Sequence, residues 1–141
     1  MLSRFTFAVS LLASVVAPIL AGAAECPTLD GAEKLELLAH ARTCDESMAL
    51  FQDCSYGAGG DVGLGDEVVK KCERDFLTKL NGWQRQVYDR KQARCARKYE
   101  NERGSMYRSF EAFCSAILAQ KYAHRFSNKT QHEPKAEQPA N

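Results

Sequence analysis

The chain has 141 residues, of which 45% are hydrophobic and 26% charged, and its formal net charge is only +1. That length suits a single domain, and the balanced charge argues against the general attraction to nucleic acid that strongly basic chains show. Six cysteines in so short a chain are typical of a small disulfide-bonded fold in an oxidising compartment.

An N-terminal segment, residues 1–24, has the order of a secretory signal peptide. Arg4 supplies the positive charge, residues 5–20 are mostly apolar, and an Ala-Gly-Ala run follows. The apolar run is nearly long enough for an uncleaved membrane anchor, but Pro18 and the small residues after it favour cleavage. We therefore expect a mature chain that begins near Glu25, is periplasmic or secreted, and has no stable membrane insertion.

Helical spacing dominates residues 25–126, which we expect to form one domain. A first helix is expected after Asp30, whose carboxylate can cap free N–H groups, with Glu33 three residues on as in a capping box. Thr43 and Glu46 repeat this signal, so a break followed by a second, short helix is expected there. The inward residues of the two helices are expected to be Leu35, Leu38, Met48, Phe51 and Cys54.

Residues 55–65 contain five glycines. This composition predicts a mobile loop, because glycine loses more backbone entropy in a helix than other residues do. The loop is either a plain connector or a binding loop that carries Tyr56 and Asp61. Asp66 and Glu67 favour the start of a third helix through capping and the helix dipole. Its inward stripe is expected to comprise Val69, Cys72, Phe76 and Leu80.

The C-terminal half is expected to form a helical hairpin. Asn81-Gly82 marks a turn before an arginine-rich helix, and Gly104-Ser105 marks the turn before the last helix. Residues 127–141 contain almost nothing apolar, so we expect a disordered tail. The inward residues of the hairpin are expected to be Trp83, Val87, Cys95, Tyr99, Met106, Phe110, Phe113, Cys114, Ile117 and Lys121, with Tyr122 and Phe126 beside them.

Together these elements predict an all-α fold, a small disulfide-stapled bundle of four to five helices. Cys95 and Cys114 lie almost equally far from the turn at Gly104, so an antiparallel hairpin would bring them to the same height and allow a bridge. Cys44 and Cys54 would be about 15 Å apart within one continuous helix and could not bond there. The partners of Cys26, Cys44, Cys54 and Cys72 stay open at this point.

No pattern typical of catalysis or of metal binding stands out. His40, His124 and His132 are scattered, and the chain lacks a Gly-x-Ser-x-Gly motif, a phosphate-binding glycine loop and a Cys-x-x-Cys pair. We therefore expect a protein that is not an enzyme and has neither a metal nor a cofactor. Acids predominate in residues 25–75 and Lys and Arg in residues 85–108, where we expect a solvated or internally paired face and no nucleic acid.

Several short motifs in residues 80–122 have counterparts in a known family. Gln84-Arg85 leads to Cys95, then come the Gly-Ser turn and Cys114, and a Leu-Asn pair precedes them. In these motifs the segment resembles the bacterial family of LprI-type lysozyme inhibitors. Val87 stands where the family has a tryptophan, and Lys-Gln replaces its Arg-Asp pair.

The resemblance implies an exported, non-catalytic protein that binds and inhibits lysozyme. Lysozymes of the c-type are cationic and cleave with two carboxylates in a cleft, so an acidic surface would steer association and a protruding loop would fill the cleft. The alternative is a structural or envelope-stress periplasmic protein that binds another envelope protein and inhibits nothing. The residues chosen as the candidate binding site are Asp53, Tyr56, Asp61, Asp66 and Glu67.

Overall fold

The computed structural model describes the backbone of residues 25–131 and the side chains as far as residue 127. This part of the chain is all-α, as predicted, with five α-helices, a short 3₁₀ turn and no strand. The predicted signal segment, residues 1–24, and the tail residues 132–141 lie outside it. The elements are α1 (Gly31–His40), α2 (Cys44–Cys54), α3 (Asp61–Phe76), η1 (Leu77–Lys79), α4 (Gly82–Tyr99) and α5 (Ser105–Gln131).

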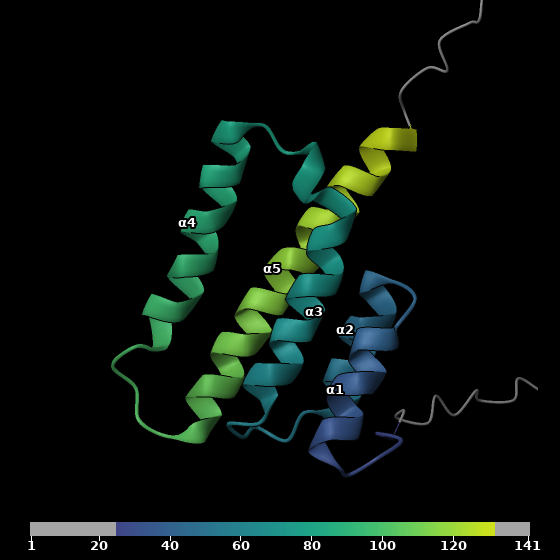
Figure 1. The fold of residues 1–141 in the computed structure, drawn as a ribbon. Coiled ribbons are helices and arrows are strands. Elements are labelled where there is room, and N and C mark those ends of the chain that lie inside the picture. The colour runs from purple at the N-terminus through teal and green to yellow at the C-terminus, as the bar shows by residue number, and fades with distance from the viewer. Residues whose placement is uncertain (1–24, 132–141) are drawn as a thin grey trace, which may run out of the picture.

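Two long helices, α3 and α5, run side by side in the same direction at the centre of the bundle (Figure 1). Asp61 contacts Ser109 near their first turns, and the rings of Phe76 and Phe126 stack further along. On one side α1 and α2 cover α3, while α4 returns along α5 on the other side and packs mainly against it. The predicted C-terminal hairpin is thus confirmed, with Gly104 at a φ of 117° in its turn.

The close approach of α3 to α5 corrects the predicted loop at residues 55–65. Helix α3 begins at Asp61, not at Asp66, and includes two of the five glycines. At Gly65 an added Cβ would lie 2.8 Å from the Cβ of Ala112 and 3.2 Å from its backbone oxygen. Glycine is therefore needed here inside a helix, because no side chain fits between the two backbones.

Replacing Gly65 by alanine should destabilise the protein by about 1–2 kcal/mol, because overpacking between α3 and α5 outweighs the gain in helix propensity. Gly63 is the matched control, since its added Cβ would meet only the flexible end of Leu35 at 3.4 Å. Gly63→Ala should leave stability unchanged or raise it slightly. Urea unfolding followed by circular dichroism compares the two variants, and equal effects would contradict the tight crossing.

The inward face predicted for the last helix is wrong in part. Met106, Phe110 and Ile117 remain 50%, 42% and 37% exposed, whereas Tyr122 and Phe126 are buried as predicted. The crossing with α3 is too close for large side chains, so small residues take their place in the core. The buried small residues of α5 are Ser109, Ala112, Ala116, Ala119 and Ala123.

The start of α4 also differs from expectation. Trp83 is 70% exposed, and Tyr88 takes its place in the core at 1% exposure. The Tyr88 hydroxyl donates a hydrogen bond to Glu73 at 2.9 Å and accepts one from Gln92 at 2.7 Å. Burial raises the pKa of Tyr88 well above its usual value, so the hydroxyl stays protonated and keeps α4 tied to α3.

The predicted helix starts are confirmed at α1 and α2, although their capping boxes are incomplete. Asp30 accepts from the backbone N–H groups of Ala32 and Glu33 at 2.9 and 3.0 Å, and the Thr43 hydroxyl accepts from the N–H of Glu46 at 3.1 Å. The structure's complete capping box starts α4. There Asn81 and Gln84 each bond the other's backbone N–H at 2.9 Å.

Three disulfides staple the bundle. The predicted bridge between Cys95 and Cys114 is confirmed and joins α4 to α5. The first residue of α2 is bridged to α3, and its last residue is bridged to the segment before α1, so α2 is fastened at both ends. These two bridges are Cys44–Cys72 and Cys26–Cys54.

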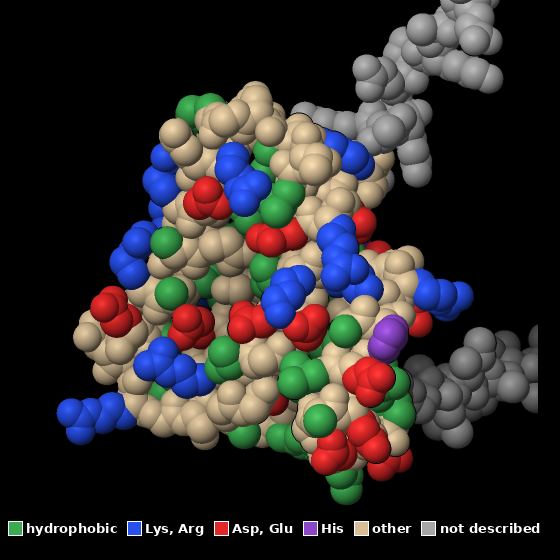
Figure 2. Space-filling view, in the orientation of Figure 1, with side chains coloured by type: hydrophobic (Ala, Val, Ile, Leu, Met, Phe, Trp, Pro, Cys, Tyr) green, Lys and Arg blue, Asp and Glu red, His purple; other side chains and the backbone are tan. Residues whose placement is uncertain are grey.

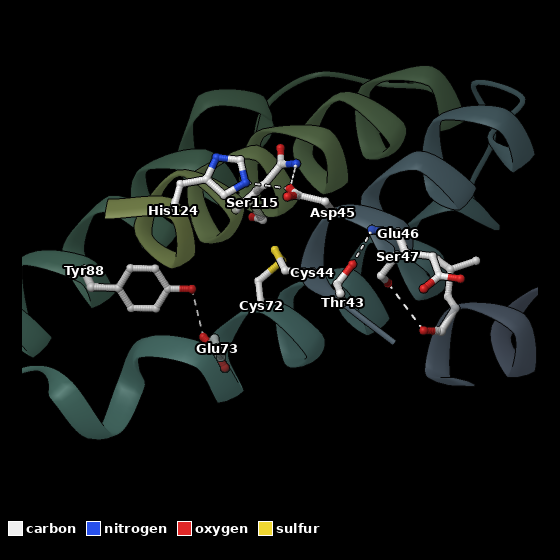
Figure 3. The surroundings of a disulfide bond; sticks show 12 residues. Thr43, Cys44, Asp45, Glu46, Ser47, Cys72, Glu73, Tyr88, Ser115 and His124 are labelled. Carbon is white, nitrogen blue, oxygen red and sulfur yellow. Dashed lines mark hydrogen bonds and ion pairs between the residues drawn. A yellow bond between two sulfur atoms is a disulfide. The ribbon is translucent and has the colours of Figure 1, made fainter. Parts of the chain in front are cut away.

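A polar contact between α2 and α5 lies beside the Cys44–Cys72 bridge (Figure 3). The carboxylate of Asp45 lies 2.6 Å from both the amide of Gln120 and the imidazole of His124. These partners, Gln120 above all, hold the pKa of Asp45 below its usual value. The contact is exposed and supplements the disulfide in holding α2 in place.

Candidate functional site

The turn between α2 and α3, residues 55–60, is organised by the carboxylate of Asp61. Its two oxygens accept hydrogen bonds from the backbone N–H groups of Tyr56, Gly57 and Ala58, at 3.2, 2.9 and 3.1 Å. The hydroxyl of Ser109 donates to the same carboxylate at 2.7 Å. The predicted loop at residues 55–65 is therefore a shorter turn, residues 55–60, which the Asp61 carboxylate anchors to α3 and α5.

Asp61 itself is only 3% exposed. Its carboxylate is fully engaged by donors within the protein, so it has no free oxygen to offer a partner. Of the candidate binding residues chosen from the sequence, Asp61 thus belongs to the framework. The correction has a simple cause: a sequence does not distinguish an exposed acid in a loop from a buried acid that holds the loop.

Tyr56 projects from this turn and is 61% exposed. The ammonium of Lys34, on α1, lies 4.3 Å from the centre of its ring, an arrangement that stabilises the cation and fixes the ring. Lys34 is only 7% exposed and lines a hollow of about 280 Å³ together with Leu35 and Leu64. Tyr56 is therefore a fixed, protruding aromatic side chain, as a binding anchor requires.

The other three acids chosen from the sequence do not gather around Tyr56. Asp53 is half-buried on α2, and Glu67 on α3 is paired with Lys70 at 2.6 Å. Asp66 is exposed, but it follows Asp61 by five residues and points about 140° away from it around the helix. The structure thus brings together only Tyr56 and Asp61.

A second hollow lies on the outer side of α1 and has an acidic lining. It has a volume of about 450 Å³ and is formed between α1 and the chain segment before it. Glu33 accepts a hydrogen bond from Thr28, and Glu36 lies 3.7 Å from His40. Among the side chains described, neither glutamate is paired with a lysine or an arginine. The hollow is lined by Pro27, Thr28, Glu33, Glu36, Leu37 and His40.

We use the name α1 surface for the exposed residues on and around α1, namely Leu29, Asp30, Glu33, Leu35, Glu36 and Tyr56. Glu33 and Glu36 line the acidic hollow on one side of the helix, whereas Leu35 and Tyr56 line the other hollow on a different side. Acidic and hydrophobic side chains gather at the lower right of Figure 2, where Figure 1 places α1. Lys and Arg lie elsewhere in the same view, at the left, in the upper part and at the centre right. On this face of the molecule the lower right is thus the acidic part.

Sequence reasoning missed Glu33, Glu36 and His40 as members of a hollow. From the sequence Glu33 was assigned only to a capping box, His40 was one of three scattered histidines and Glu36 had no binding role; all three are exposed. Their spacing of three and four residues places them on one side of α1, which was the available signal. What the sequence did not contain was the return of residues 27–28 beside that side, which the Cys26–Cys54 bridge imposes.

Two kinds of reactive group are absent from the described part of the chain. All six cysteines are in disulfides, so no thiol is free to act as a nucleophile. No group of three or more His, Cys, Asp or Glu side chains within residues 25–127 is arranged to hold a metal ion. The arrangement found at the α1 surface can do what rigid charged surfaces do, namely bind.

No protein-family model, no curated protein and no solved structure matches the chain. In the described residues no helix is long and apolar enough to cross a membrane. Three disulfides, all buried or half-buried, place the folded protein outside the reducing cytoplasm.

Proposed function

We propose that this protein is an exported, non-catalytic binding protein whose α1 surface docks a cationic protein, and that this partner is a lysozyme. The acidic hollow of α1 is the observation that carries the proposal. Within residues 25–127 neither glutamate of the hollow is paired with a lysine or an arginine, so a lysine or arginine of a partner can enter and pair with them.

The surroundings of the hollow support a protein partner. A standard interface covers about 800 Å² on each side, and a partner that contacts both the acidic hollow and Tyr56 would have to reach around α1, because the two sites share no lining residue. Leu29 and Tyr56, 83% and 61% exposed, supply the apolar and aromatic contacts that dominate binding energy. The bridges at both ends of α2 hold this surface rigid, which lowers the entropy lost on binding.

Lysozyme as the partner rests on the resemblance of residues 80–122 to LprI-type inhibitors and on charge. A cationic lysozyme would be steered toward the acidic end of the molecule and away from the basic α4. Residues 80–122, which carry the resemblance, include the disulfide-bonded hairpin of α4 and α5. In this proposal the lysozyme binds at α1, on the opposite side of the bundle. Export to the periplasm or the medium belongs to the same proposal.

The oxidised protein should slow the lysis of bacterial cell walls by c-type lysozyme at low salt, and less so at high salt. The double variant E33K/E36K should weaken inhibition at least about tenfold, because it reverses the charge of both glutamates that line the hollow. Turbidity assays with increasing amounts of protein measure both effects.

The matched control is E100K/E102K, which changes the net charge equally but at exposed residues of the α4–α5 turn. It should inhibit like the parent protein. An unchanged lysozyme rate at large molar excess would remove lysozyme as the partner. A pull-down that retains an envelope protein and no lysozyme would then support the structural or envelope-stress role.

A further inference from the structure

The α4–α5 hairpin carries a groove on the side away from α3. Its apolar floor consists of the Cys95–Cys114 bridge together with Ile117 and Leu118, and its volume is about 350 Å³. Four cations form the rim, three of them from α4. They are Lys91, Arg94, Lys98 and Lys121.

None of these four cations has a carboxylate within 4.0 Å among the side chains described as far as residue 127. Other cations of this half are paired, as Arg85 is with Asp89 at 3.4 Å and Arg108 with Glu111 at 3.0 Å. Of the two predicted alternatives for the basic face, solvated or internally paired, the groove shows the solvated one. Lys91 and Lys98 lie over the rings of Tyr122 and Tyr99, at 5.3 and 4.9 Å from the ring centres, which leaves their positive charge in place. Four like charges without a carboxylate partner around an apolar floor favour the binding of an anion.

The apolar part of the groove extends beyond its floor. Ile117, Phe110 and Met106 follow one another along α5 and remain 37%, 42% and 50% exposed. At the other end Lys91 also lines a neighbouring hollow of about 240 Å³, which contains Trp83. A ligand that suits this surface must therefore be both anionic and apolar.

We propose that the groove binds a single-chain anionic amphiphile, a long-chain carboxylate. The carboxylate would be held by Arg94 and Lys98, of which arginine offers two parallel N–H donors, and the alkyl chain would lie on Ile117 and Leu118. The volume of about 350 Å³ lies at the lower end of the range of small-molecule sites, which begins near about 300 Å³.

The test is a titration of the oxidised protein with monomeric palmitate, followed by the fluorescence of Trp83, the single tryptophan of the chain. We expect a saturable change with one palmitate bound. The variant R94E/K98E should lose at least about tenfold in affinity, because both carboxylate donors become repulsive. The matched control R90E/R97E reverses two exposed arginines of α4 that do not line the groove, and its affinity should stay within about twofold of the parent.

Further probes separate head group from chain. Hexadecyltrimethylammonium has the same kind of chain with a cationic head, and acetate has the head group alone; neither should bind. Equal affinity for the cationic amphiphile, or equal losses in the two double variants, would overturn the proposal. So would cosedimentation with phosphatidylglycerol vesicles without binding of monomeric palmitate, because the groove would then be a membrane contact.

Discussion

Replacing Asp61 by alanine should destabilise the protein by about 3–4 kcal/mol. The carboxylate accepts three backbone N–H bonds and one from Ser109, and both Asp61 and Ser109 are nearly fully buried. Removing the acceptor leaves these donors without partners, which is more costly than the loss of an exposed hydrogen bond. Equilibrium unfolding in urea measures the change in free energy.

Asp66→Ala is the matched control, since Asp66 is an exposed acid on the same helix and should change stability by less than about 0.5 kcal/mol. A second readout separates the turn from the fold as a whole. Amide hydrogen exchange at residues 56–58 should accelerate in Asp61→Asn, which keeps one carbonyl acceptor and loses less stability. Equal costs for the two alanine variants would show that Asp61 does not organise the turn.

Removing the Cys44–Cys72 bridge by alanine at both positions should lower the free energy of unfolding by about 4–5 kcal/mol. Its sequence separation is 28 residues, for which the loop-closure model gives about 3.6 kcal/mol. Both sulfur atoms also belong to the core, since Cys44 and Cys72 are 4% and 0% exposed. Their loss adds the energy of a small cavity.

The Cys95–Cys114 bridge provides the comparison, because it spans 19 residues and lies under the open groove between α4 and α5. Its removal should cost less, about 3 kcal/mol. Both double variants are compared by urea unfolding, with the remaining bridges verified by peptide mapping without reduction. A larger loss of stability on removal of Cys95–Cys114 than on removal of Cys44–Cys72 would contradict the prediction that the buried bridge contributes more.

The sequence predicts the helices of this protein well because local signals specify them. Asp30 and Thr43 cap the first two helices as expected, and Gly104 makes the turn of the hairpin. The Cys95–Cys114 bridge can be predicted because the two residues lie at similar sequence distances from that turn and therefore at the same height in an antiparallel hairpin. The other two bridges could not be predicted in this way, because local sequence signals do not show how α2 lies relative to α3 and to the segment before α1.

Faces of helices were harder to predict than helices. The large apolar residues of α5 suggested its inward side, but close packing against Gly65 and its neighbours selects alanine and serine for the core. The same close crossing leaves Met106, Phe110 and Ile117 outside, where they extend the proposed groove. These three residues were wrongly predicted to face the core, and their exposure is what makes them available to a ligand of the groove.

The candidate site was likewise predicted only in part from the sequence. From the sequence came an acidic N-terminal half and a tyrosine beside a glycine-rich turn, and Tyr56 is indeed exposed there. Only the tertiary structure decided that Asp61 is buried and that Glu33 and Glu36 line a hollow. Composition, capping and cysteine number are properties of the chain alone, whereas burial and pairing of charges depend on which distant segments meet.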